Sequence, residues 1–208
     1  LVDQSEVQMF LIEQELIELG YGGVILPLIA NILDEARLAH ILARFRPAVI
    51  FHAAAHKHVP MMELQPTEAI QNNILGTARL AEMALACAAE RFVLISTDKA
   101  INPTSVMGAC KRLAEIFVQA LHANGPGRTK FMAVRFGNVL GSSGSVVPIF
   151  QKQIAAGGPV KVTQPDVTRY FMTIREAVGL VLVSALGDYG ELCVLEMGEP
   201  VRIADLAH

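Results

Sequence analysis

The sequence has little of what marks secreted, membrane-embedded or disulfide-stabilised proteins. Its three cysteines, Cys87, Cys110 and Cys193, are scattered and form no CxxC pair, so we expect reduced thiols in a cytoplasmic compartment. No apolar run approaches the ~20 residues that a membrane span requires. Residues 1–6 lack the basic start and the apolar stretch of a signal peptide. These absences favour a cytoplasmic domain.

An initiator methionine is lacking as well. The chain opens abruptly on residues that look like the end of a strand. We therefore interpret it as a fragment, or as a chain without its true beginning.

The chain also has no strong excess of charge of either sign, with a formal net charge of -3 and a pI of about 6.1. Bulk electrostatics therefore give no support for nucleic-acid binding. Hydrophobic residues make up 52% of the 208 residues and charged residues 18%, so a sizeable core can be buried. This size fits one large α/β domain, or one domain with a small appended lobe.

What the sequence does have is an alternation of short apolar runs with longer amphipathic stretches. This pattern is typical of a parallel sheet covered by helices on both faces. The runs predict strands at 24–29, 48–51, 92–95 and 131–134. Helices are expected at about 5–19, 34–45, 66–89 and 104–124. The sequence therefore predicts an α/β, Rossmann-like doubly wound parallel sheet.

After residue 136 the pattern changes, which divides the chain into a core at 1–136 and a small C-terminal substrate lobe at 137–208. The lobe opens with a polar, glycine- and serine-rich loop at 137–145. The elements expected after this loop are a helix near 146–156, a strand-like segment at 160–163, a helix near 175–186 and a strand near 193–197.

Polar residues follow three of the predicted strands, at 53–58, 96–99 and 137–145. Ligands of open α/β sheets bind beyond the carboxyl ends of the strands. The common position of the three clusters favours one shared site over three solvated loops.

Asp98 and Lys99 are the most informative pair in these clusters. An acid and a base side by side can protonate a leaving hydroxyl and abstract a proton. On local chemistry alone, however, such a pair is more often a surface turn with a solvated lysine.

The helix expected at 104–124 adds a second element. Met107 and Lys111 are spaced i, i+4 and therefore share one face of it. A lysine held there could hydrogen-bond a ribose, whereas the alternative is that Lys111 and Arg112 face water.

Three histidines, His52, His56 and His58, raise the possibility of a zinc site. Glu63 is the only acid nearby, and no further ligand stands at a supporting spacing. We therefore expect no metal.

Six stretches carry a resemblance to a known family, in this order along the chain: 49–60, 73–77, 96–103, 135–145, 168–174 and 197–201. The most distinctive read STDKAINP at 96–103 and RFGNVLGSSGS at 135–145. Together they resemble the polysaccharide-biosynthesis 4,6-dehydratases, extended short-chain dehydrogenases that act on UDP-N-acetylglucosamine and related UDP-sugars. The resemblance covers essentially the whole chain, and it replaces the interpretation of Asp98 and Lys99 as a plain turn.

The resemblance implies a 4,6-dehydration with NAD as the cofactor. It implies that Thr97 bonds the sugar C4 oxygen, that Lys99 removes the C5 proton and that Asp98 protonates the departing C6 hydroxyl. Lys111 is implied to bond the nicotinamide ribose. Since the hydride taken from C4 returns to C6, no net redox change is expected.

The resemblance also implies binding residues for both ligands. Those implied for NAD are Asp3, Asn31, Ala53, Ala54, Asn73 and Lys111. Those implied for the UDP-sugar are His56, Lys57, Asn138, Val160 and Arg169. Asp3 would hold the adenosine ribose hydroxyls and favour NAD over NADP. On this assignment 1–136 is the NAD-binding core, and 137–208 is the nucleotide-sugar-binding part, interleaved with the core.

Three departures from the family pattern stand out. The first strand and the Gly-rich phosphate loop are missing, which should impair dinucleotide affinity. Met107 occupies the position of the usual catalytic Tyr, and a thioether cannot transfer a proton, so deprotonation of the C4 hydroxyl falls to Asp98 or Lys99 with Thr97. Asn31 stands where the family usually has an Asp facing the adenine.

Met107 also resembles the large, membrane-tethered subgroup of these dehydratases. We therefore expect the full-length protein to be anchored through N-terminal segments absent here. A homo-oligomer formed through the helices near 66–89 and 104–124 is expected too.

Two other functions stay open. A UDP-sugar 4-epimerase shares hydride removal at C4 but needs no Asp-Lys pair and normally relies on the Tyr. A non-catalytic dinucleotide-binding module fits Met107 and the missing glycine loop, but it has no need of an elimination acid and base.

Overall fold

The computed structural model describes residues 1–124, 129–142, 145–162, 166–187 and 189–207. The main sheet of this part has four parallel strands in the order β3-β4-β5-β9. These strands are β3 (Val49–His52), β4 (Arg91–Thr97), β5 (Lys130–Phe136) and β9 (Leu192–Val194). Phe92, Val93 and Leu94 are all fully buried although neighbouring side chains of a strand point to opposite faces. The sheet is therefore covered on both sides.

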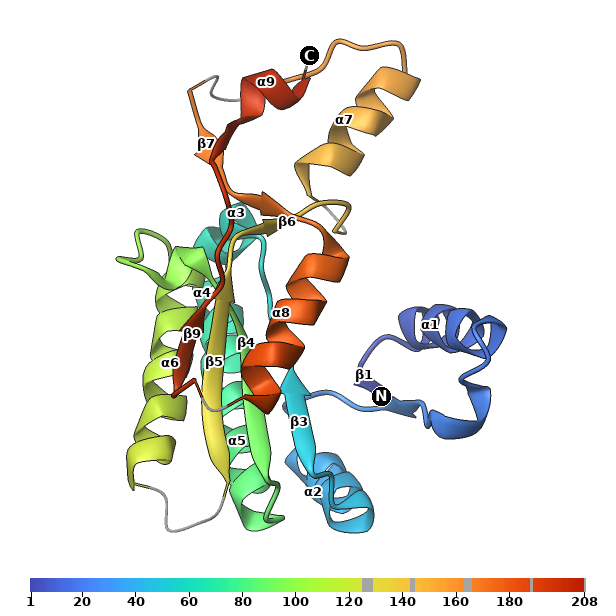
Figure 1. Cartoon of the computed structure of the whole chain (residues 1–208), viewed down its shortest axis with the longest axis vertical. Coiled ribbons are helices and arrows are strands. Elements are labelled where there is room, and N and C mark those ends of the chain that lie inside the picture. Colours follow the sequence, from blue (N-terminus) through green and yellow to red (C-terminus); the bar gives the residue numbers. More distant parts are fainter. Residues whose placement is uncertain (125–128, 143–144, 163–165, 188, 208) are drawn as a thin grey trace.

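Helices cover the two faces as the doubly wound pattern requires (Figure 1). One face carries α2 (Glu35–Phe45), α5 (Thr77–Ala86) and α6 (Val106–Asn124), which share an apolar core with the sheet. The other face carries α8 (Ile174–Leu186), which buries Ala177, Val181 and Ala185 against the strands. The predicted fold class is confirmed.

The stretch predicted as one helix at 66–89 is helical in three parts. These parts are α4 (Pro66–Ala69), the π-helix η2 (Ile70–Gly76) and α5. A short helix that the sequence did not indicate, α3 (Val59–Leu64), precedes them. Its Glu63 accepts a hydrogen bond from the Val106 backbone N–H at 2.7 Å and so caps the start of α6.

The N-terminal residues form a unit that lies to one side of β3 (Figure 1), and its Leu28 packs against the main apolar core. It consists of α1 (Glu6–Glu18), a 3-10 helix η1 (Gly22–Val24) and two parallel strands, β1 (Val2–Asp3) and β2 (Leu28–Ile29). The prediction of a strand over all of 24–29 is wrong at its start. Pro27 has no N–H to donate to a ladder, so the strand begins only at Leu28. Among the described strands, β1 pairs only with β2 and β3 only with β4.

The remaining elements lie beyond the end of the main sheet that carries α3 (Figure 1). They are β6 (Asn138–Val139), α7 (Val146–Ala155), β7 (Thr168–Arg169), β8 (Phe171–Met172), β10 (Val201–Arg202) and α9 (Ile203–Ala207). β6 pairs with β8 in parallel, and β7 with β10 antiparallel. From the same C-terminal stretch, β9 pairs with β5 of the main sheet and α8 packs against it.

Two strand predictions in this part are corrected. Residues 160–162 are not a strand, because the Lys161 N–H bonds the Gln153 side chain of α7 at 3.0 Å rather than another strand; Thr163 lies outside the described residues. The strand predicted near 193–197 is β9, which ends at Val194. In the described part of the chain, no helix is long and apolar enough to cross a membrane.

Candidate active site

The candidate site begins where β4 ends. Thr97 is the last residue of the strand and caps the 3-10 helix η3 (Asp98–Ala100), its hydroxyl accepting from the Lys99 N–H at 3.3 Å. The same hydroxyl donates to Asp98 Oδ1 at 2.9 Å, and Lys99 Nζ donates to that oxygen at 3.0 Å. The Lys99 and Asp98 side chains are 34% and 32% exposed, so the acid–base pair is sheltered but accessible.

Asn138 joins this turn to the neighbouring strand. It follows β5, whose Phe136 is the register partner of Thr97 in β4. Lys99 Nζ donates to Asn138 Oδ1 at 3.2 Å. The structure therefore brings two of the three predicted polar clusters into direct contact at the carboxyl ends of neighbouring parallel strands.

Lys111 reaches the same strand from helix α6. It is only 5% exposed, and its Nζ donates to the Ile95 carbonyl of β4 at 2.6 Å. Burial lowers the pKa of Lys111 to about 8, against the opposing effect of the Glu115 carboxylate. Lys111 therefore does not face water, and it carries a proton at neutral pH.

His52 lies close enough to Lys111 for the positive charge of the lysine to affect its pKa. Burial, with the positive charge of Lys111, lowers the pKa of His52 to about 3. Its Nε2 lies 2.8 Å from the Thr77 hydroxyl. His52 is thus a neutral, hydrogen-bonded residue of the core.

Met107 is 3% exposed and packs with Met62, Ala69 and Cys110 in an apolar cluster between α6 and the α3–α4 segment. It lies one turn before Lys111, on the helix face that the spacing predicted. Met107 therefore contributes apolar packing, and any acid–base chemistry at the site must come from other residues.

Helix α6 approaches the Asp98–Lys99 turn very closely at Gly108. A Cβ at this position would lie 2.3 Å from the Lys99 carbonyl oxygen. Only a residue without a side chain allows the helix to pack against the turn at this distance.

The third polar cluster, the loop after β3, is held by Asn73 of the π-helix η2. Asn73 is 1% exposed, and its side-chain amide bonds the backbone N–H and carbonyl of His56, each at 2.8 Å. The loop leaves Ala53 and Ala54 exposed at the strand end, followed by half-buried His56 and exposed Lys57.

Asp3 and Asn31 lie together at the carboxyl ends of β1 and β2. Both are exposed. Asp3 accepts from the Ser5 N–H at 2.7 Å, and Asn31 donates to the Gln4 side chain at 2.9 Å. Their side chains are placed on the rim of the N-terminal unit, away from the Asp98–Lys99 turn in sequence and in sheet.

A cavity of about 280 Å³ opens next to Asn138. Its lining consists of Asn138, Val146, Phe150, Lys161, Val162, Val167, Arg169 and Ile203. Asn138 and Arg169 were predicted substrate residues, whereas Val160 is not part of the lining and its neighbour Lys161 is. The sequence did not single out Lys161 or the apolar walls, because they meet only through the folding of three distant segments. Two cations beside apolar walls suit an anionic ligand with a flat, apolar ring.

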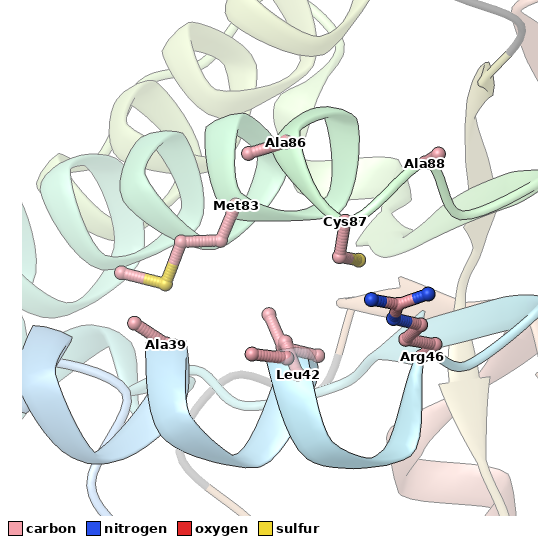
Figure 2. Close-up of a pocket in the computed structure, with 8 residues that line it drawn as sticks. Ala39, Leu42, Arg46, Met83, Ala86, Cys87 and Ala88 are labelled. Carbon is pink, nitrogen blue, oxygen red and sulfur yellow. The ribbon is translucent and has the colours of Figure 1, made fainter.

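A larger cavity, of about 450 Å³, lies between α2 and α5 (Figure 2). Ala39, Leu42, Met83 and Cys87 contribute to its walls, and Arg46 is its charged group. It sits where these helices end, just before β3 and β4 begin. This is the opposite end of the sheet from Asp98 and Lys99, so the smaller cavity is the one that adjoins the candidate site.

Metal ligands do not gather in the described residues: no group of three or more His, Cys, Asp or Glu side chains could hold an ion there.

The sheet order and the covering helices define a Rossmann-like α/β domain with its candidate site at the strand ends. A family model for polysaccharide biosynthesis proteins matches residues 1–208, and the chain belongs to this family.

Three curated relatives show the range of proteins that the chain is similar to. It is 53% identical to the capsular polysaccharide biosynthesis protein CapD of Staphylococcus aureus over 210 residues, which is 100% of this chain and 35% of the relative. It is 40% identical to a UDP-glucose 4-epimerase of Rickettsia massiliae over 134 residues, 64% of this chain and 39% of the relative. It is 35% identical to the inverting UDP-N-acetylglucosamine 4,6-dehydratase of Campylobacter jejuni over 182 residues, 86% of this chain and 54% of the relative.

Among solved structures, the chain is similar to Pen from Bacillus thuringiensis, with a TM-score of 0.92 and 33% identity. The match covers 99% of this chain and 63% of that one. The chain thus spans about a third of the length of CapD and less than two thirds of Pen.

Proposed function

We propose that the complete protein is a nucleotide-sugar 4,6-dehydratase that converts UDP-N-acetylglucosamine, or a related UDP-sugar, to the 4-keto-6-deoxy sugar for surface polysaccharide or glycan biosynthesis. The observation that carries the proposal is the unbroken chain of contacts from Thr97 through Asp98 and Lys99 to Asn138. This chain ends at the cavity that holds Lys161 and Arg169. An elimination acid and base therefore stand beside a pocket suited to a nucleotide diphosphate.

The residues present suit an NAD cofactor, which supplies a hydride acceptor for C4 and a hydride donor for C6 when it is bound. Lys111 is a buried cation at the carboxyl end of β4, where a ribose hydroxyl can accept its hydrogen bonds. Ala53 and Ala54 present small, exposed side chains at the end of β3, which leave their backbone accessible. The exposed carboxylate of Asp3, with Asn31 beside it, suits the adenosine end.

On this proposal each polar residue of the turn acts on one sugar atom. Thr97 bonds the C4 oxygen and links it to the Asp98 carboxyl. Lys99 removes the C5 proton, which is acidic once C4 is a ketone. Asp98 protonates the C6 hydroxyl as it leaves as water.

On the substrate side, Asn138 and Arg169, with Lys161 of the segment that begins at Val160, hold the UDP part. His56 and Lys57 on the Asn73-clamped loop face the sugar. These assignments keep the reacting carbons near the Asp98–Lys99 turn, because Asn138 contacts both the turn and the cavity.

The second candidate is a UDP-sugar 4-epimerase, favoured by the 40% identity to an epimerase over part of the chain. An epimerase needs the C4 chemistry alone and has no use for Asp98 and Lys99 as an elimination pair. The contact between these two residues therefore favours dehydration.

The test is the product that the full-length protein forms from UDP-N-acetylglucosamine in the presence of NAD. We expect NMR to show a methyl group at C6 and a keto or hydrated keto carbon at C4. A 4-epimer that keeps its C6 hydroxyl would refute dehydration and establish the alternative.

A further inference from the structure

Glu115, a residue outside the proposed reaction, is the most completely buried charged group of the described chain, with 0% exposure. It lies on α6 one turn after Lys111 and therefore on the same helix face. Its carboxylate receives four hydrogen bonds. The donors are Ser96 Oγ at 2.5 Å, Arg135 Nε at 2.8 Å, Arg135 Nη2 at 2.5 Å and Arg112 Nη1 at 3.1 Å.

The positions of two donors are informative. Ser96 on β4 and Arg135 on β5 are register partners in the parallel ladder. The next pair along is Thr97 and Phe136, after which the two strands leave the sheet. Glu115 thus joins α6, β4 and β5 at the last point before both strands enter the site.

Stability alone does not account for such a group. Removing a charge from water costs several kcal/mol, and well-packed apolar residues often replace buried ion pairs without loss of stability. Directional bonds do what apolar packing cannot, because they fix where the donors stand relative to one another.

We propose that Glu115 is a positioning residue that sets the relative placement of Asp98–Lys99 and Asn138 by bonding Ser96 and Arg135 at once. The contact of Lys99 Nζ with Asn138 Oδ1 at 3.2 Å joins the segments that follow these two strands, three residues further along each chain segment. A shift of β4 against β5 would open this contact first.

The charge state of Glu115 is consistent with this role. Burial raises the pKa of its carboxyl, but the hydrogen bonds from Arg135, Ser96 and Arg112 outweigh burial and leave the pKa below its usual value. The group is a carboxylate at neutral pH and can accept all four bonds.

The experiment compares two variants that each remove one donor from the same carboxylate. Ser96→Ala removes the bond to β4, whereas Arg112→Ala removes the bond from a partly exposed residue of α6 itself, 37% exposed. Both leave the Arg135 pair in place and are expected to fold. Replacement of Glu115 is avoided, because it would leave Arg135 buried without its partner.

The catalytic readout rests on the proposed dehydratase function. In the full-length enzyme, we expect Ser96→Ala to lower kcat by about tenfold to about a hundredfold, since a small misplacement of reacting groups has an effect of this size. KM for the UDP-sugar should change little. Arg112→Ala should keep kcat, and Ser96→Thr, which retains the hydroxyl, should restore it. Wild-type kcat in Ser96→Ala, or an equal loss in Arg112→Ala, would overturn the proposal.

A second readout separates this inference from the proposed function. Hydrogen exchange of the Lys99 and Ile101 amides, which bond within the turn, needs no turnover. Faster exchange in Ser96→Ala than in Arg112→Ala supports the role of Glu115 even if the wild type forms no dehydrated product. Equal exchange in the two variants contradicts it.

Discussion

On the proposed mechanism, the chemistry of the site depends on the contact between the neighbouring residues Asp98 and Lys99. Lys99 Nζ and the Thr97 hydroxyl both donate to Asp98 Oδ1, so one carboxylate oxygen holds both neighbours in place. On the proposed mechanism, Asp98 takes the proton of the C4 hydroxyl through Thr97 as C4 is oxidised and so becomes the carboxylic acid, and Lys99 in its amine form is the base. These are the forms that can take a proton from C5 and give one to the leaving C6 oxygen.

Two substitutions test these roles separately. Asp98→Asn keeps an oxygen that can accept from Thr97 and Lys99 but has no proton to give, and Lys99→Ala removes the base. We expect each to lower the rate of elimination by about a hundredfold or more. Calorimetric titration should show UDP-sugar binding largely unchanged, because the cavity does not include either side chain. Wild-type turnover in either variant would remove the mechanism.

The pKa of Lys111 predicts how kcat/KM depends on pH. Its folded pKa of about 8 lies below the ordinary value of 10.5, so the ammonium that we propose to bind the ribose is lost as pH rises through about 8. We expect kcat/KM, which reports the free enzyme, to fall above that pH. His52, with a pKa of about 3, cannot produce this limb. A profile that stays flat well above pH 8 would show that the Lys111 charge is not needed.

The contribution of Lys111 to the free energy of unfolding should change with pH in the opposite direction to its effect on activity. Between pH about 8 and 10.5 the unfolded chain binds more protons at Lys111 than the folded chain does. The free energy of unfolding attributable to Lys111 therefore rises over this window, since the cost of burying its charge disappears. Above pH about 8, kcat/KM should therefore fall while the contribution of Lys111 to the free energy of unfolding rises. Measuring both quantities over this range separates the two effects.

At the scale of elements, the site depends on how closely α6 packs on the turn after β4. Gly108 allows this approach, because a Cβ would lie 2.3 Å from the Lys99 carbonyl oxygen. Backbone atoms on both sides leave no flexible side chain to move aside. The helix and the turn would have to separate to accommodate a methyl group.

Gly108→Ala is therefore expected to destabilise the protein by about 1–3 kcal/mol, as overpacking does. Gly179→Ala in α8 is the matched control, since a Cβ there meets nothing within 4 Å. An alanine in an unhindered helix position stabilises by roughly 0.5–1 kcal/mol. Urea denaturation should show opposite signs for the two variants. Stabilisation by both would mean that the close contact does not constrain α6.

The sequence predicted the strands whose apolar runs are bounded by polar residues. It did not predict features that depend on tertiary contacts. The strands near 92 and 131 and their polar ends were predictable, because strand periodicity and the strand-end rule act locally. The π-helix at Asn73 and the four-way network of Glu115 were not, since their partners lie far away in the sequence. Of the three segments where strand predictions were corrected, 24–29 contains Pro27 and 160–163 directly follows Pro159.

At the scale of the whole molecule, the described chain contains the proposed elimination groups and part of a cofactor site. Its strands β1 and β3 each have one edge without a partner among the described strands. The membrane anchor and the homo-oligomer remain predictions. Activity is therefore to be measured on the full-length protein.

The most direct test of the central claim is the fate of the C5 hydrogen during turnover in D₂O. If Lys99 removes this proton and an ammonium equilibrated with solvent returns one to C5, the 4-keto-6-deoxy product should carry mostly deuterium at C5. Mass spectrometry and NMR of the product formed by the full-length enzyme from UDP-N-acetylglucosamine would show it. A product that keeps its C6 hydroxyl and its original hydrogen at C5 would contradict elimination by the Asp98–Lys99 pair.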